Sequence, residues 1–106
     1  MSQIVVHNGT VYLAGQVGDD MAAGVEQQTR EVLASIERLL EEAGTDKTRI
    51  LSVTIYLKDI DAHFAGMNAV WDQWLPQGTA PARATVEARL CEPEILVEMS
   101  VVAALP

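Results

Sequence analysis

The chain has 106 residues, which is enough for one domain with an adequate but not generous core. Its formal net charge of −8, with fifteen acidic residues against seven lysines and arginines, opposes binding to a phosphate backbone, so we expect no nucleic-acid partner. Hydrophobic residues make up 49% of the chain but aromatic residues only 5%, which predicts an aliphatic core of the kind formed by a sheet packed against helices.

Apolar runs are short throughout the chain. The longest, such as Ile95–Val97 and Val101–Leu105, fall far below the roughly 20 residues that a membrane-spanning helix needs. The N-terminal segment is interrupted by polar residues and lacks a basic start, so we expect a cytoplasmic protein with no membrane partner. Cys91 is the only cysteine, and His7 and His63 have no partners at ligand spacing. We therefore expect no disulfide and no bound metal.

The first elements in chain order are a hairpin and a helix. Gln3–His7 and Thr10–Gln16 flank the dipeptide Asn8-Gly9, which supplies the positive φ angles of a two-residue type I′ turn. Beyond a polar loop, apolar residues at steps of three and four predict a helix over Val25–Ala43, ended by Gly44. The outward face of this helix is charged, so its apolar stripe packs against a sheet.

The second half of the chain predicts three strands and one helix. Arg49–Lys58 is rich in β-branched residues and alternates polar with apolar side chains, as a strand does. A helix begins near Asp61 as its N-cap and ends near Leu75, before a loop that contains two prolines. Two strands, Ala82–Leu90 and Ile95–Ala103, follow and are joined by a short turn.

The predicted order is ββαβαββ, with no internal repeat and no linker. It indicates a single α+β domain over residues 1–106, in which two helices cover one face of a mixed sheet. The other face then needs a cover, and association with further copies of the chain supplies one.

Polar residues in the last two strands are the first candidates for chemistry. Arg83 and Thr85 share one strand face with Glu87 and Arg89, and we expect the opposite, apolar face to lie against the helices. Glu98 is the one acid in the last strand. If the turn pairs these strands directly, Glu98 lies on the face of Arg83 and roughly 13 Å from it. A small ligand would then touch both only where Arg83 of one chain meets Glu98 of the next.

Ordinary structural explanations stand beside these functional ones. A lone glutamate in a strand commonly faces solvent, and an arginine after a proline-rich loop, as Arg83 is, commonly forms a surface ion pair. Asn68 flanks the apolar stripe of the second helix as a boundary residue would. Cys91 sits at a turn and needs no function. Trp71 and Trp74 are expected to pack in the core or an interface.

Short motifs lie along nearly the whole chain: Gly15-Gln16, Gln28-Thr29, Ala43-Gly44, Thr54-Ile55-Tyr56-Leu57 with Asp59, Met67-Asn68, the run from Pro81 to Ala88, and Val97-Glu98-Met99. Together they resemble the motifs of the Rid (RidA/YjgF) family. The resemblance implies a chorismate-mutase-like fold and a homotrimer with a central barrel and three intersubunit clefts. It also implies hydrolysis of reactive 2-imino and enamine acids, such as 2-aminoacrylate and 2-iminopropanoate, to 2-oxo acids and ammonia without a cofactor.

The resemblance also implies roles for individual residues. Arg83 falls on the family's carboxylate-binding arginine, a role that suits a guanidinium fork. Glu98 falls on the site glutamate and would orient or deprotonate the attacking water. Asn68 and Thr85 would line the cleft. Met1 stands where many members have a site tyrosine, so a second hypothesis stays open, in which the cleft binds a 2-oxo or amino acid for regulation without turnover.

Overall fold

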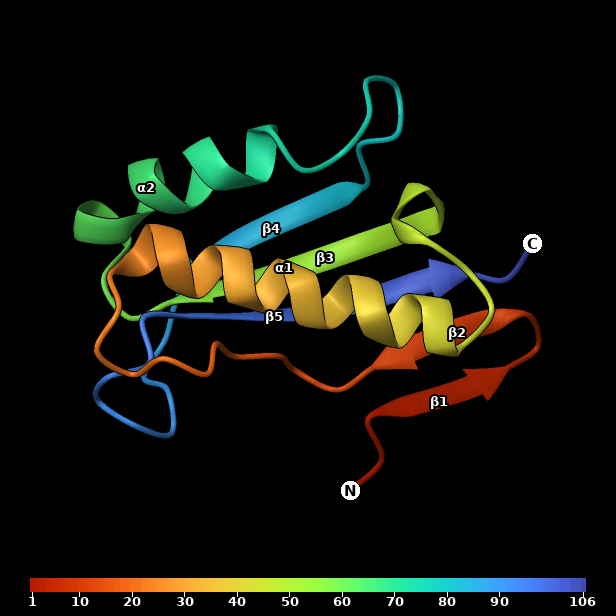
Figure 1. Cartoon of the computed structure of the whole chain (residues 1–106), viewed down its shortest axis with the longest axis horizontal. Coiled ribbons are helices and arrows are strands. Elements are labelled where there is room, and N and C mark those ends of the chain that lie inside the picture. The colour runs from red at the N-terminus through yellow and green to blue at the C-terminus, as the bar shows by residue number, and fades with distance from the viewer.

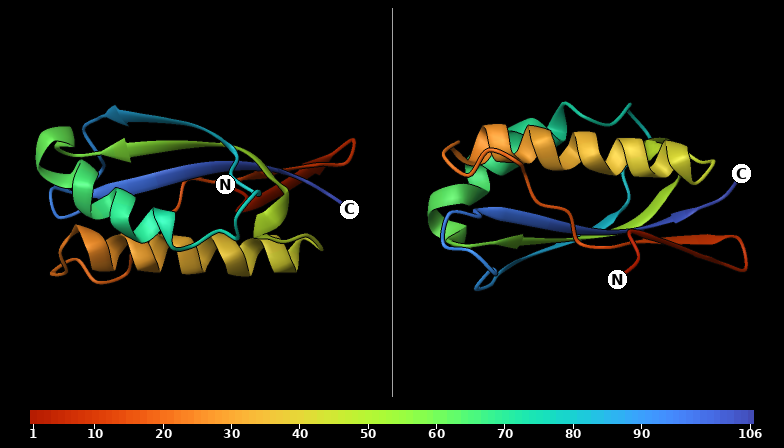
Figure 2. Two further views of the ribbon diagram at one scale, coloured as in Figure 1. Left: turned by 90° about the horizontal axis from the view of Figure 1, so that it is seen from above. Right: turned by 60° about the horizontal axis from the view of Figure 1, so that its bottom comes forward.

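The computed structural model describes all 106 residues and consists of a five-stranded mixed sheet with two helices on one face (Figures 1 and 2). In chain order the elements are β1 (Ile4–His7), β2 (Thr10–Leu13), α1 (Val25–Glu42), the short 3₁₀ helix η1 (Lys47–Arg49), β3 (Ile50–Leu57), α2 (Ile60–Asp72), β4 (Ala82–Glu87) and β5 (Val97–Ala104). The predicted α+β class and ββαβαββ order are therefore confirmed. No helix has the length and apolar character needed to cross a membrane.

Local signals in the sequence produced the expected hairpin turn and the expected end of α1. Asn8 and Gly9 have φ angles of 50° and 75°, as the predicted two-residue hairpin requires. Gly44, with φ 91°, follows the end of α1. The N-cap of α2 is Asp59 rather than the predicted Asp61, and its carboxylate accepts a hydrogen bond of 3.0 Å from the backbone N–H of Ala62.

The predicted pairing of the last two strands is wrong, because β3 lies between them in the sheet order β1-β2-β5-β3-β4. Strand β4 is parallel to β3, with Arg83 opposite Val53, and β5 is antiparallel to β3, with Glu98 opposite Tyr56. Parallel neighbours need a crossover, and α2 supplies it between β3 and β4. Figure 1 shows the resulting place of β4 at the sheet edge beside α2.

The two faces of β4 are the reverse of those predicted. Directly opposed residues of neighbouring strands share a face, so Arg83 lies on the side of the buried Val53, toward the helices. Val86 pairs with Tyr56 on the other face and is 42% exposed. Alternation along a strand groups side chains but does not say which group meets the core; the register with β3 decides that.

A buried glutamine ties the loop before β5 to α1. Gln28 is fully buried, and its amide nitrogen donates to the carbonyl oxygens of Ala23 and Glu94, at 3.0 and 2.9 Å. Its amide oxygen accepts a hydrogen bond of 2.9 Å from the N–H of Leu96. These bonds satisfy a polar side chain that would otherwise be costly to bury. They also fix the loop over residues 88–96, which forms part of the site described below.

No helix covers the other face of the sheet (Figure 2). Val5, Tyr12 and Val86 lie on this face by register and are 50%, 45% and 42% exposed. We call it the open face. Exposed apolar side chains on an uncovered sheet face are a common feature of interaction sites.

Candidate functional site

Arg83 on β4 is held by three side chains of α2. Its Nη1 atom donates a hydrogen bond of 2.8 Å to Oδ1 of Asn68, and its guanidinium carbon lies 5.3 Å from the ring centre of Trp71 and 5.9 Å from that of Phe64. Phe64, Asn68 and Trp71 recur at steps of four and three, so one helix face presents all three. The aromatic faces stabilise the cation without using its N–H donors.

No carboxylate neutralises Arg83 within the chain. The one ion pair of the protein joins Lys47 to Glu37. Because the single side-chain hydrogen bond to Asn68 occupies one of the five N–H donors of the guanidinium, donors remain for a planar bidentate acceptor. We call Arg83, Asn68, Thr85, Phe64 and Trp71 the arginine cluster.

Thr85 supplies an unpartnered hydroxyl on the same face of β4, about 7 Å along the strand from Arg83. Its Oγ1 atom is buried and makes no hydrogen bond. Such a group is uncommon in folded proteins and costs free energy unless something satisfies it. Arg83, Thr85 and Asn68, three of the four residues predicted for the site, therefore lie together.

Glu98, the fourth, lies elsewhere. It is opposite Tyr56 and therefore on the open face, whereas Arg83 is on the helix-covered face, so the prediction that the two share a face is wrong. The error has one cause: β3 separates the strands that were expected to pair. Within one chain, no small acid touches both residues.

Glu98 borders a hollow of about 330 Å³ on the open face. The other residues that line it are Gly15, Tyr56, Ala88, Arg89, Leu90, Cys91 and Ser100. A Cβ atom on Gly15 would overlap the carboxylate of Glu98, so only glycine allows this close approach. We call this the glutamate hollow. The close approach places Gly15 of the motif Gly15-Gln16 beside Glu98.

Tyr56 and Arg89 were missed as residues near Glu98. The alternation of Ser52, Thr54 and Tyr56 placed the phenol on a polar strand face, but only the register with β5 sets it beside Glu98. Arg89 was expected on the face of Arg83; because β4 ends at Glu87, the chain has left the strand by that point. Cys91, expected to be incidental, is exposed and lines the hollow.

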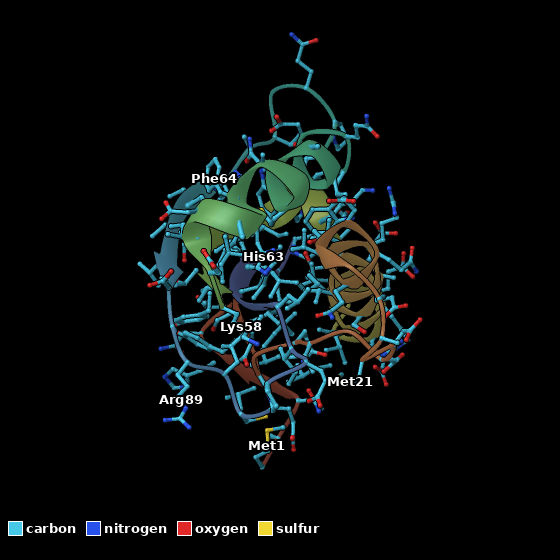
Figure 3. All side chains as sticks on the ribbon, turned by 90° about the vertical axis from the view of Figure 1, so that its left-hand side faces the viewer. Met1, Met21, Lys58, His63, Phe64 and Arg89 are labelled. Carbon is cyan, nitrogen blue, oxygen red and sulfur yellow. The ribbon has the colours of Figure 1, made fainter.

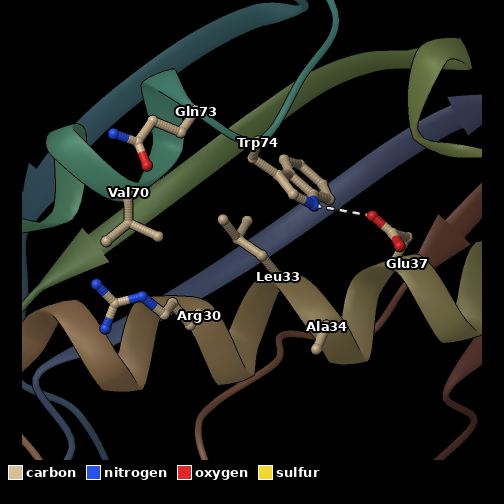
Figure 4. A pocket seen from close by; sticks show the side chains of 7 residues that line it. All are labelled: Arg30, Leu33, Ala34, Glu37, Val70, Gln73 and Trp74. Carbon is tan, nitrogen blue, oxygen red and sulfur yellow. Dashed lines mark hydrogen bonds between the residues drawn. The ribbon is translucent and has the colours of Figure 1, made fainter.

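A second hollow, of about 310 Å³, lies between α1 and α2 (Figure 4). Two of the side chains that line it are bonded to each other: Nε1 of Trp74 donates to Glu37 at 3.0 Å, and Lys47 lies 2.8 Å from the same carboxylate. The hydrogen bond from Lys47, with that from Trp74, lowers the pKa of Glu37. Trp74 therefore packs the helix pair, as predicted.

A family model described as endoribonuclease L-PSP matches residues 1–105. The crystal structure of a YjgF family member from Neisseria meningitidis is 43% identical, with a TM-score of 0.95 over 100% of this chain and 87% of that one. The chain belongs to the YjgF/Rid family. Its Escherichia coli relative, the RutC family protein YoaB, is 43% identical over 104 residues, which are 98% of this chain and 90% of the relative.

Another YjgF/Rid structure, a Rid family protein of unknown function from Yersinia pestis, is 33% identical, with a TM-score of 0.90 over 99% of this chain and 87% of that one. The resemblance based on the sequence motifs is thus confirmed at the level of family and fold. The relatives' names agree on the family and name no common substrate.

Proposed function

We propose that this YjgF/Rid protein is a cofactor-independent hydrolase of small 2-imino and enamine acids, acting in the cytoplasm at clefts between the subunits of a homotrimer. The arginine cluster is the observation that carries the proposal. It combines an arginine without an acidic partner and a buried hydroxyl without any partner, which together suit the two oxygens of a carboxylate. An exposed free thiol at Cys91 suits a reducing compartment.

The positions of Arg83 and Glu98 support a site shared between copies. Arg83 lies on the edge strand β4, where another subunit can approach it, and Glu98 lies on the open face. Association through the open face would bury its exposed apolar side chains and bring the edge of one sheet to the glutamate hollow of the next. Sheets packed in this way form the central barrel of the proposed trimer.

The proposed reaction needs one acid-binding site and one base. Arg83 and Thr85 hold the substrate carboxylate, while Glu98 of the neighbouring subunit accepts a proton from water as the water oxygen attacks C2 of the imine. The imine nitrogen takes up that proton, which gives a neutral carbinolamine. Glu98 then moves the proton of the new hydroxyl group to the nitrogen as the C2–N bond breaks, so that ammonia leaves and the 2-oxo acid remains. An enamine substrate first gains a proton at C3 to become the imine.

A coupled assay tests this proposal directly. An amino-acid oxidase generates 2-iminopropanoate from alanine, and semicarbazide traps the imine that remains. We expect micromolar protein to lower the yield of trapped imine, and Arg83→Ala to abolish the effect. Arg38→Ala changes an exposed arginine of α1 and is the matched control. No acceleration by the wild-type protein would rule out the proposal for this substrate.

The second candidate is binding without turnover. Met1, in the place of the family's site tyrosine, is 99% exposed and brings no hydroxyl to the site. Titration calorimetry with 2-oxobutyrate or pyruvate, run beside the activity assay, separates the two candidates: binding with no loss of imine favours this one. We do not propose RNA cleavage, which the name of the family model suggests, because the net charge of −8 opposes RNA binding.

A further inference from the structure

Arg89 is the one cation that borders the glutamate hollow. It lies in the loop after β4, is exposed, and forms no ion pair with Glu98 or with any other acid of the chain. In Figure 3 the side chain of Arg89 extends outward and lies well away from Phe64, the residue whose ring contacts Arg83. None of the five arginines of the chain forms an ion pair, and two of them lie at the candidate site: Arg83 in the arginine cluster and Arg89 beside Glu98.

We infer that Arg89 binds a second anionic group of the substrate, so that the site prefers dicarboxylic 2-imino acids of four or five carbons. This inference rests on the proposed function, since it takes the α-carboxylate to be held by Arg83 of the neighbouring subunit. With C2 placed near Glu98, the substrate side chain extends along the hollow toward Arg89.

The size of the hollow supports a longer substrate. The hollow has a volume of about 330 Å³ and is open to solvent. A three-carbon imino acid has six heavy atoms and a five-carbon dicarboxylic one has ten, so the longer acid fills more of this space. The hydroxyl groups of Tyr56 and Ser100 line the same hollow and can donate hydrogen bonds to a distal carboxylate.

Charge gives the stronger argument. The chain carries a net charge of −8, and Glu98 adds a carboxylate at the hollow itself, so a doubly negative substrate is repelled unless a cation faces its second charge. Lys58, the other cation near this loop, already donates to the carbonyl oxygen of Pro93 at 2.6 Å. Arg89 forms no ion pair and can bind the second carboxylate of the substrate.

Binding of two 2-oxo acids to the full chain tests the inference. Titration calorimetry compares 2-oxoglutarate, which has a distal carboxylate, with 2-oxobutyrate, which has none. We expect the wild-type protein to bind 2-oxoglutarate about tenfold more tightly, as one charge-assisted hydrogen bond implies. Arg89→Gln should remove this preference and leave the affinity for 2-oxobutyrate unchanged, while Arg38→Gln, on the exposed face of α1, should change neither.

The inference is overturned if the wild-type protein binds 2-oxoglutarate and 2-oxobutyrate with equal affinity, or if the preference for 2-oxoglutarate survives Arg89→Gln. It is also overturned if Arg89→Gln lowers the affinity for both acids equally, because Arg89 would then be the primary carboxylate site. Absence of 2-oxoglutarate binding also overturns it. Failure of the proposed function is seen separately. It appears as no turnover of imines made from alanine or glutamate, or as normal binding of both acids to Arg83→Ala.

Discussion

The buried hydroxyl of Thr85 predicts a substitution that raises stability and lowers ligand affinity together. Its Oγ1 atom has no hydrogen-bond partner, and a buried unsatisfied hydroxyl costs about 1–3 kcal/mol. Valine has nearly the same shape, places a methyl group where the hydroxyl lies, and suits a strand. We expect Thr85→Val to raise the free energy of unfolding by about 1 kcal/mol or more, which corresponds to about 4 °C or more in melting temperature for a domain of about this size.

The same substitution removes a hydrogen-bonding group beside Arg83. A hydrogen bond to a charged carboxylate contributes about 1.5–3 kcal/mol, so the affinity for 2-oxobutyrate should fall about ten- to a hundredfold. Urea denaturation and titration calorimetry on one preparation, at one protein concentration, measure the two effects. Thr85→Ser is the matched control, because it keeps the hydroxyl and loses the methyl group; it should be less stable than the wild type and bind with similar affinity.

The two measurements together decide whether the hydroxyl faces a ligand. A Thr85→Val protein that is less stable than the wild type would show that the hydroxyl has a partner in the folded protein. A variant that gains stability and binds 2-oxobutyrate as tightly as before would refute the role of Thr85 in the site while leaving Arg83 untouched.

Three further predictions follow from named contacts. Gly15→Ala should displace the Glu98 carboxylate and lower the rate of imine hydrolysis at least tenfold, with an unchanged far-ultraviolet circular dichroism spectrum; an unaltered rate would contradict the close approach. The pKa of Glu37 is lowered in the folded protein by Lys47, so its stabilising effect is present above the ordinary glutamate pKa and is lost as the pH falls through the lowered value. Glu37→Gln should therefore cost less than about 1 kcal/mol at pH 7, since the pair is partly exposed, and nothing at strongly acidic pH, as urea denaturation across pH would show. Val86→Asp puts a charge on the open face and should reduce the particle mass in sedimentation; an intact trimer would argue against association through this face.

The expected positions of the predicted site residues were right where they follow from one element and wrong where they depend on strand order. Arg83 and Thr85 were correctly placed on one face of β4, because side chains alternate along any strand. Asn68 was named as a site residue, but its hydrogen bond to Arg83 needs α2 to pack over the sheet edge. Glu98 was put on the wrong face, because a short loop was read as a hairpin turn when it leads past β3.

The sequence by itself determined the local structure of this protein. The turn at Asn8-Gly9, the apolar stripe of α1 and the stop at Gly44 depend on φ preferences and side-chain spacing within a few residues. Only the tertiary structure decided that β4 pairs parallel to β3, that Arg83 faces α2, and that Glu98 shares its hollow with Arg89 rather than Arg83. These arrangements depend on which strands become neighbours, and that choice rests on burial summed over the whole sheet, which no short stretch of sequence encodes.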